Sequence, residues 1–179
     1  MPDPADHLQT VGEIVQALRV LGLEPVLVGG MALVVLGSRR VTRDFDFVIA
    51  HPGNRLARTV GIFYDRGFEL VSRLSEMGEV ISTIANRKVA AIRLRLDAPA
   101  NAYFFNAETG LRVDLLFDFP IPAAKLAGRA TRTKIRTHVF DIACEQDLLR
   151  LKRIAKAARS APGDAEDIAF LESRRKGST

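Results

Sequence analysis

Residues 26–46 read VLVGGMALVVLGSRRVTRDFD, and this stretch decides the fold of the chain. Residues 24–28 end in three apolar side chains in a row, which favours a short strand covered on both faces. Two glycines follow, and the apolar segment 31–36 then predicts a short helix that ends at the next glycine. A second strand is expected over 44–49, where an acidic pair opens an apolar run. The predicted order is therefore strand, glycine pair, helix and strand.

The glycine pair, Gly29 and Gly30, favours a phosphate contact. Because glycine has no side chain, backbone N–H groups at this junction can approach a phosphate closely, at the positive end of the following helix. The pair belongs to neither of two well-known phosphate loops, because no Gly-Lys-Ser/Thr follows it and the third glycine of the dinucleotide-binding fingerprint is missing. A plain turn is the alternative interpretation.

Two carboxylates begin the second strand. Residues two apart on a strand point to the same face, so Asp44 and Asp46 project together while Phe45 faces the core. The two charges repel each other, and Mg²⁺, which binds carboxylates together with substrate phosphates, would remove that repulsion. A solvent-exposed pair of acids is the alternative.

A third acid, Asp114, lies inside the strongly apolar segment 111–117. A charge in such a strand is costly unless it is paired or bound to a metal. If this strand lies beside the strand 44–49, Asp114 joins Asp44 and Asp46. Three such carboxylates can hold two metal ions about 3.5–4 Å apart for in-line phosphoryl or nucleotidyl transfer. The alternative for Asp114 is an ion pair with a nearby arginine.

The rest of the chain predicts further helices and strands around this centre. We expect an α/β (α+β) fold with a mixed, mostly antiparallel sheet flanked by helices. Residues 1–143 would form the α/β domain, and residues 144–179 a helical C-terminal tail packed on it. Helices are predicted over 5–21, 54–66, 120–128, 145–159 and 164–174, and the segment 72–87 is expected to be mostly helical. Further strands are predicted over 91–96, 103–106 and 111–117, with a polar strand or hairpin over 131–142.

Composition excludes several classes of protein. The chain has 179 residues, of which 47% are hydrophobic and 26% charged, as in a globular rather than a disordered protein. No stretch approaches the roughly 20 apolar residues of a membrane span, and the acidic start lacks the features of a signal peptide. A single cysteine, Cys144, excludes a disulfide framework and a thiolate zinc site, so we expect a cytoplasmic protein with no membrane partner.

The net charge of +5 is unevenly distributed. Residues 1–124 contain 13 basic and 14 acidic residues, whereas residues 125–179 contain 13 basic and 7 acidic ones. The basic last third predicts either a surface for phosphate or nucleic acid, or a solvated basic face.

The order of these motifs resembles the signature of the polymerase-β-type nucleotidyltransferase superfamily. The chain has an apolar residue, Gly29-Gly30, thirteen further residues and then Asp44-Phe45-Asp46. Within it, the segment 40–46 (RVTRDFD) is similar to the Arg-x-Thr-x-Asp-x-Asp segment of bacterial nucleotidyltransferases related to abortive-infection toxins. The segments 147–152 and 164–168 are similar to that group's tail, in which a lysine-bearing helix precedes a helix that opens with acids. The chain departs from this pattern at Gly163, where a basic residue is expected.

The resemblance implies roles for the motif residues. Asp44, Asp46 and Asp114 would bind Mg²⁺ or Mn²⁺, and Asp114 would accept the proton of the attacking hydroxyl. Contacts to a nucleoside triphosphate are implied for Gly29 and Gly30 beside the triphosphate, Ser38 through its hydroxyl, Lys152 on the pyrophosphate leaving group, and Arg40 and Thr42. The alternatives are a solvated helix face for Lys152 and a bracing role before the catalytic strand for Arg40 and Thr42.

The function that the resemblance implies is metal-dependent transfer of a nucleoside monophosphate from an NTP to a hydroxyl, with release of pyrophosphate. The acceptor stays open between tRNA or another nucleic acid, a protein and a small molecule, and the toxin-like relatives imply a cognate antitoxin or a part in phage defence. The second interpretation is a non-catalytic nucleotide-binding or partner-binding module on the same fold. The third is an unrelated nucleic-acid-binding domain, ranked last because unneutralised acids would repel phosphate.

Overall fold

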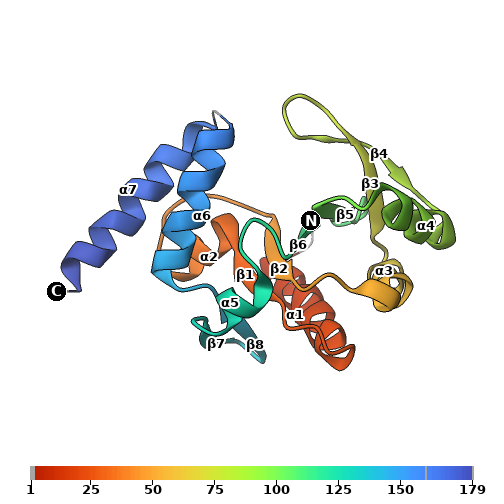
Figure 1. Ribbon diagram of the computed structural model, residues 1–179, viewed down its shortest axis with the longest axis horizontal. Helices are drawn as coiled ribbons and strands as arrows, with labels where there is room; N and C mark the ends of the chain where they lie inside the picture. The colour runs from red at the N-terminus through yellow and green to blue at the C-terminus, as the bar shows by residue number, and fades with distance from the viewer. Residues whose placement is uncertain (1–2, 160, 179) are drawn as a thin grey trace.

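The computed structural model describes residues 3–159 and 161–178, so positions 1, 2, 160 and 179 of the two expected domain ranges lie outside the described residues. Within these residues eight strands form one sheet, with helices packed around it (Figure 1). The strands are β1 (Val26–Val28), β2 (Phe45–Ile49), β3 (Glu69–Leu74), β4 (Val80–Ile84), β5 (Asn101–Phe105), β6 (Arg112–Phe117), β7 (Thr131–Ile135) and β8 (His138–Ile142). The helices are α1 (Pro4–Val20), α2 (Gly29–Val35), α3 (Leu56–Tyr64, preceded by a 3₁₀ turn, Gly53–Arg55), α4 (Arg87–Asp97), α5 (Ala123–Ala127), α6 (Glu145–Ala158) and α7 (Pro162–Gly177).

The sheet has the order β4-β3-β5-β6-β2-β1-β8-β7. Two neighbouring pairs, β1–β8 and β2–β6, are parallel, and the other pairs are antiparallel. The expected mixed, mostly antiparallel sheet with helices around it is therefore confirmed.

The glycine pair joins two central strands. β1 pairs antiparallel with β2, with Leu27 opposite Phe47. Helix α2 begins at Gly29, directly after β1 ends, and packs against both strands. The predicted order of strand, glycine pair, helix and strand is confirmed, although the helix begins at the first glycine rather than at residue 31.

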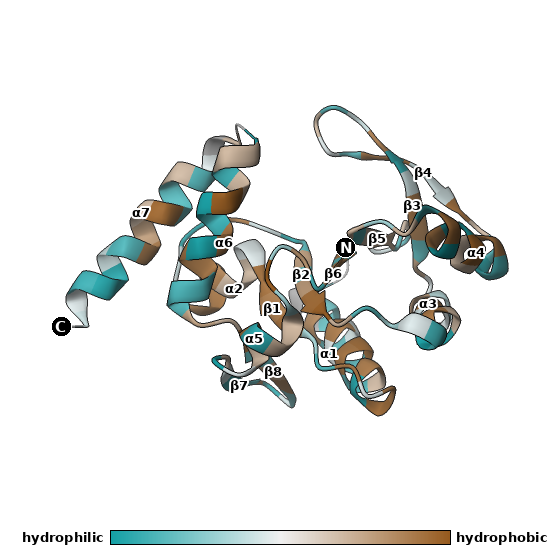
Figure 2. Ribbon diagram, viewed as in Figure 1, coloured by the Kyte–Doolittle hydropathy of each residue, from teal (hydrophilic) through white to brown (hydrophobic). Residues whose placement is uncertain are grey.

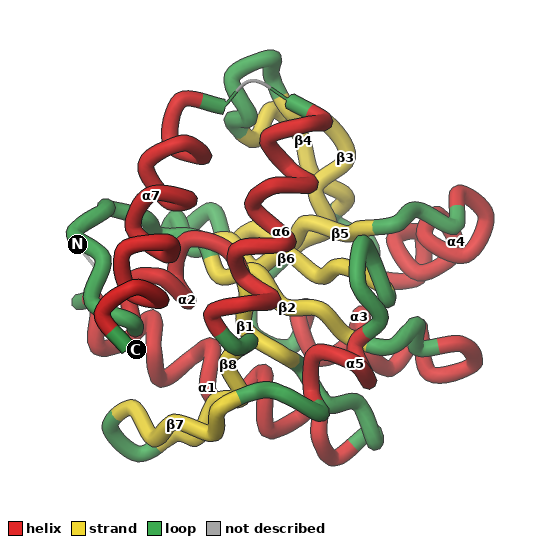
Figure 3. The backbone as a smooth tube through the Cα atoms, turned by 60° about the vertical axis from the view of Figure 1, so that its left-hand side comes forward, coloured by secondary structure: helices red, strands yellow, loops and turns green. Residues whose placement is uncertain are grey.

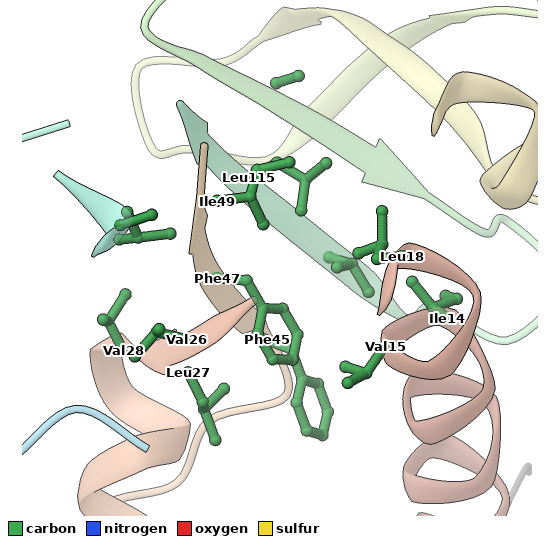
Figure 4. Close-up of a cluster of buried hydrophobic side chains, with 14 of the residues drawn as sticks. Ile14, Val15, Leu18, Val26, Leu27, Val28, Phe45, Phe47, Ile49 and Leu115 are labelled. Atoms are coloured by element: carbon green, nitrogen blue, oxygen red, sulfur yellow. The ribbon is translucent and has the colours of Figure 1, made fainter. Parts of the chain in front are cut away.

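The core lies where α1 packs against the sheet. Ile14, Val15 and Leu18 of α1 face Phe45 and Phe47 of β2, and all five side chains are at most 3% exposed (Figure 4). Figure 2 shows hydrophobic residues along β1, β2 and α1. Burial of each large apolar side chain stabilises the fold by about 1.5–3 kcal/mol. Because neighbouring residues of a strand point to opposite faces, the residue between the two phenylalanines is turned away from α1.

Residues 69–84 form a hairpin, so the predicted helix over 72–87 is wrong. β3 and β4 pair antiparallel, with register shifts on either side of Arg73. The turn between them contains Gly78 in a left-handed conformation, φ +81°. The periodicity of this polar segment is weak, and its pairing with β5 on the other side decides its conformation.

Residues 87–97 form a helix, so the predicted strand over 91–96 is also wrong. Asn86 caps this helix, because its side-chain oxygen accepts hydrogen bonds from the N–H groups of Lys88 (2.9 Å) and Val89 (3.2 Å). The alternation of arginine with apolar residues that favoured a strand belongs instead to a helix with apolar residues on more than one side. The inner face of α4, buried against α3 and β4, consists of Ala90, Ala91 and Leu94.

The C-terminal helices α6 and α7 pack against each other and lie close to α2 (Figures 1 and 3). The Arg174 guanidinium of α7 donates a hydrogen bond of 2.8 Å to the carbonyl oxygen of Leu36, just past the end of α2. Of the polar strand or hairpin predicted over 131–142, the structure has the hairpin, formed by β7 and β8. In the described part of the chain no helix has both the length and the apolar character needed to cross a membrane.

Candidate active site

The three acids singled out in the sequence lie at the centre of the sheet. Asp46 of β2 is directly opposite Asp114 of the parallel strand β6, and Asp44 immediately precedes β2. Asp114 is buried, with 5% of its surface exposed, whereas Asp44 and Asp46 are half-buried. The two acidic strands are thus neighbours, as the convergence of the carboxylates required, and the structure brings Asp46 and Asp114 together.

Burial raises the pKa of both Asp46 and Asp114, and repulsion from neighbouring carboxylates adds to the shift. Burial, the Asp114 carboxylate and the Asp44 carboxylate raise the pKa of Asp46 to about 8, while Arg112 opposes the shift. Burial also raises the pKa of Asp114, against the lowering effect of Arg112. Two close, poorly hydrated carboxylates are stabilised in their charged form only by positive charge nearby, so the cluster favours a cation.

Arg112 supplies part of that positive charge. Its Nε lies 2.7 Å from Oδ1 of Asp114 and its Nη2 2.8 Å from Oδ2, so both carboxylate oxygens accept from one guanidinium. The same guanidinium lies 4.6 Å from the ring centroid of Tyr103 and donates 3.2 Å to the carbonyl oxygen of Gly78. The ion pair considered as the alternative for Asp114 is therefore present. The sequence signal was the spacing, because an arginine two residues before an acid shares its face of the strand.

Gly29 lies against the acids in a conformation that requires glycine. Its φ is +69°, and a Cβ built on it would lie 2.2 Å from Oδ2 of Asp46. The Asp46 carboxylate therefore occupies the space that a side chain at position 29 would need. The first glycine of the pair thus lies directly against the acidic strand β2.

The second glycine is covered by Arg40. A Cβ on Gly30 would lie 3.0 Å from Cζ of Arg40, so the guanidinium packs directly on the backbone there. Ser38 accepts a hydrogen bond of 3.3 Å from the N–H of Arg40 and so supports the turn. Thr42 is half-buried in the same loop, two residues before Asp44. These contacts are what the bracing interpretation of Arg40 requires.

Lys152 is held in an ion-pair network with the acids of α7. Its Nζ lies 2.8 Å from Asp167 and 3.4 Å from Asp164, and its side chain is only 12% exposed. Asp167 also pairs with Arg40, and Asp164 with Arg159 at 3.5 Å. A solvated position for Lys152 is therefore wrong. Asp167 thus links Arg40, in the loop before β2, to Lys152 of α6. No signal in the sequence indicated this connection.

Comparison with known proteins gives matches in structure alone. No family model and no curated protein sequence matches this chain. The lincosamide antibiotic adenylyltransferase LnuA, solved with lincomycin bound, has a TM-score of 0.56 at 13% identity, over 92% of this chain and 96% of its own. An antigenic nucleotidyltransferase-like protein from Paracoccidioides brasiliensis has a TM-score of 0.57 at 18% identity, over 96% and 78%. The antibiotic-resistance factor ANT(2'')-Ia has 0.59 at 11% identity, over 96% and 85%. This chain has a nucleotidyltransferase fold.

The acids of this site fit a cation whose coordination is completed by a bound nucleotide. Among residues 3–159 and 161–178, no group of three or more His, Cys, Asp or Glu side chains is arranged to hold a metal ion. Because Arg112 already donates to both oxygens of Asp114, Asp44 and Asp46 are the two carboxylates of the site that no arginine engages in this way. Mg²⁺ needs only one or two protein carboxylates when substrate phosphates complete its coordination. The residues present therefore fit a cation that arrives with a nucleotide.

Proposed function

We propose that this chain is a metal-dependent nucleotidyltransferase, which transfers a nucleoside monophosphate from an NTP to a hydroxyl group and releases pyrophosphate. The observation that carries the proposal is the pairing of Asp46 with Asp114 across β2 and β6, with the backbone of Gly29 against Asp46. Packing alone gives no reason for two carboxylates at this place in the sheet, because burial raises the pKa of both and the Asp114 carboxylate raises the pKa of Asp46 further. A cation and a phosphate chain would supply the reason.

In the proposed reaction the acceptor oxygen forms a bond to the α-phosphorus. The bond from that phosphorus to the bridging oxygen breaks, and pyrophosphate leaves. Bound Mg²⁺ or Mn²⁺ would neutralise the phosphate oxygens. Asp44 and Asp46 would hold the ion, and Asp114 would take the proton of the acceptor hydroxyl. Arg112 donates one hydrogen bond to each oxygen of Asp114, and these bonds weaken Asp114 as a base unless the guanidinium moves away.

The phosphates of the NTP are proposed to lie over the glycine pair. Gly29 and Gly30 place no side chain of their own between the phosphates and the backbone, and Arg40, which packs on Gly30, would have to move aside or contact the phosphates itself. Arg40 packs on Gly30 and shares Asp167 with Lys152, so both cations are held at this end of the site. Lys152 would neutralise the pyrophosphate leaving group, and the nearby hydroxyls of Ser38 and Thr42 would contact the nucleotide.

The acceptor is proposed to be a hydroxyl compound of one of three classes. LnuA was solved with lincomycin, and ANT(2'')-Ia with adenylyl-2''-tobramycin, which supports a small-molecule acceptor by analogy of fold. The resemblance to toxin-like nucleotidyltransferases supports tRNA or a protein, together with a toxin role, a cognate antitoxin, a bacterial origin and a place in the cytoplasm.

A non-catalytic nucleotide-binding module is the second candidate, and one observation favours it. Arg112 donates a hydrogen bond to each oxygen of Asp114, the residue proposed as the base, and so lowers the pKa of that carboxyl. If Arg112 keeps this pairing with nucleotide bound, the chain binds an NTP without transferring it.

A transfer assay distinguishes the two candidates. Each α-³²P-labelled NTP is incubated with Mn²⁺ or Mg²⁺ and the chain, with total tRNA, casein or a panel of lincosamides and aminoglycosides as acceptor. The proposal expects label on one acceptor class, and loss of that label in Asp46→Asn and Asp114→Asn. Asp65→Asn, at an exposed ion pair, is the matched control and should keep activity. Nucleotide binding without transfer to any acceptor would favour the non-catalytic module.

A further inference from the structure

Helix α4 has an outer apolar face that nothing in the described chain covers. This outer stripe consists of Val89, Ile92 and Leu96, with exposed fractions of 50%, 52% and 77%. At 100° per residue the three side chains fall within an arc of about 60°, nearly opposite the buried inner face. Since an ordinary surface helix has one apolar side, the outer stripe is in excess of what folding requires.

The spacing of the outer stripe is that of a coiled-coil seam. Its residues follow one another by three and four positions, as a, d and a positions of a heptad do. Lys88 and Arg95 then occupy successive g positions and Arg93 the e position between them. Among residues 3–159 and 161–178, Lys88 and Arg95 make no ion pair, while Arg93 pairs with Asp97 at 2.7 Å. The seam is thus bordered by basic residues, two of which are available to a partner.

Charge selects among the possible occupants of this seam. A second copy of α4 would set Lys88 and Arg95 against Arg93, and like charges at facing e and g positions oppose pairing. The helix as a whole has four basic residues and one acidic residue, so self-association is unfavourable. A nucleic acid would leave the aliphatic stripe exposed to water. A lipid surface is favoured by aromatic anchors, which the stripe lacks.

We propose that the outer stripe of α4 docks one helix of a partner protein, which places aliphatic residues on the stripe and acidic residues opposite Lys88 and Arg95. Recognition of an amphipathic helix through anchors at i, i+3 and i+7 needs only a short seam of this kind. An 11-residue helix provides about 16 Å of length, which is enough for such a contact. The standard protein interface, with roughly 20–30 residues on each side, needs a larger surface.

The test uses synthetic helical peptides as probes. The acidic probe is a fluorescein-labelled peptide of three heptads with isoleucine at a, leucine at d and glutamate at e and g. The basic probe has lysine in place of every glutamate. Fluorescence anisotropy measures the binding of both to the full chain, and the acidic probe is expected to bind at least about tenfold more tightly than the basic one.

Two double variants locate the binding. Ile92→Gln/Leu96→Gln removes apolar anchors that are exposed in the free chain, so it should keep the wild-type melting curve and weaken acidic-probe binding about tenfold. Lys88→Glu/Arg95→Glu should reverse the preference to the basic probe. The matched control is Lys134→Glu/Arg136→Glu, which makes the same charge change on exposed residues of the β7–β8 hairpin, at the other edge of the sheet from β4. It should leave the preference for the acidic probe intact.

Three results would overturn the proposal. Equal binding of the two probes, or loss of preference in the β7–β8 control, would show that overall charge and not the seam attracts the peptide. A dimer in sedimentation that Ile92→Gln/Leu96→Gln dissociates would make a second copy the occupant. Binding to phosphatidylserine vesicles that the same variant abolishes would make it a membrane.

Discussion

Gly29→Ala should both strain the backbone and displace the Asp46 carboxylate. At φ +69° an alanine costs about 1–2 kcal/mol, because its Cβ approaches the following carbonyl oxygen. The new Cβ would also lie 2.2 Å from Oδ2 of Asp46, so the carboxylate must move by more than about 1 Å to reach a normal contact distance. Overpacking of this kind adds about 1–3 kcal/mol.

Gly110→Ala separates the two contributions. Gly110 has almost the same conformation, φ +72°, but a Cβ there meets nothing within 4 Å. Urea unfolding of the two variants should therefore show the backbone cost in both and the additional cost only in Gly29→Ala.

The ligand response supplies a second readout for the same variants. Mn²⁺ with a non-hydrolysable NTP at 100 times its Kd stabilises by about 2.7 kcal/mol, which is about 5–10 °C for a chain of this length. Gly29→Ala should lose most of this shift, and Gly110→Ala should keep it. Equal destabilisation of the two variants with the thermal shift intact in both would refute the close approach of Gly29 to a functional Asp46.

Three further perturbations test the electrostatics of the site. Because the pKa of Asp46 is raised from 3.8 to about 8, its contribution to stability is full below pH 3.8 and is lost as the pH rises through about 8. Metal-free wild type should thus lose stability relative to Asp46→Asn between about pH 5 and pH 8 in urea titrations, and parallel curves would contradict this. Arg112→Gln leaves Asp114 buried without its charged partner and should lower the free energy of unfolding by about 2–4 kcal/mol. Mn²⁺ with an NTP analogue should restore part of this stability. An unchanged urea midpoint would argue against the pairing. Asp167→Asn weakens the link between α7 and the loop before β2 and should lower the free energy of unfolding by about 1–3 kcal/mol. The control Glu172→Gln, in an exposed pair, should change it by less than about 1 kcal/mol. Similar values for both variants would show that the Asp167 network contributes little.

Local elements with strong signals were predictable from the sequence. Helix α1 and the β1–α2–β2 unit follow from apolar periodicity and from glycine positions, which act over a few neighbouring residues. The helix predicted over 72–87 and the strand predicted over 91–96 were wrong, because these residues form the β3–β4 hairpin and α4. The polar strands β3 and β4 have little hydrophobic periodicity. Helix α4 has apolar residues on two sides, so its residue pattern fits a strand as well as a helix.

Part of the candidate site was predictable in the same way. Asp44, Asp46 and Asp114 stood out because acids in or beside apolar strands need a reason, and the glycine pair stood out by its position between a strand and a helix. The sequence pattern did not decide whether Asp114 would bind a metal, pair with an arginine or do neither. Arg112 is two residues away in sequence, but its guanidinium also reaches Tyr103 and Gly78 on other elements.

The sequence by itself determined the order of the central elements and the acids they bear, because these depend on backbone conformation and on apolar patterns within a few residues. Only the tertiary structure decided that β6 lies beside β2, that Lys152 and Arg40 share Asp167, and that α4 turns an apolar stripe outward. Those outcomes depend on the burial of whole faces and on charges brought together from distant parts of the chain. The free energy of such contacts belongs to the assembled fold and to no single segment of it.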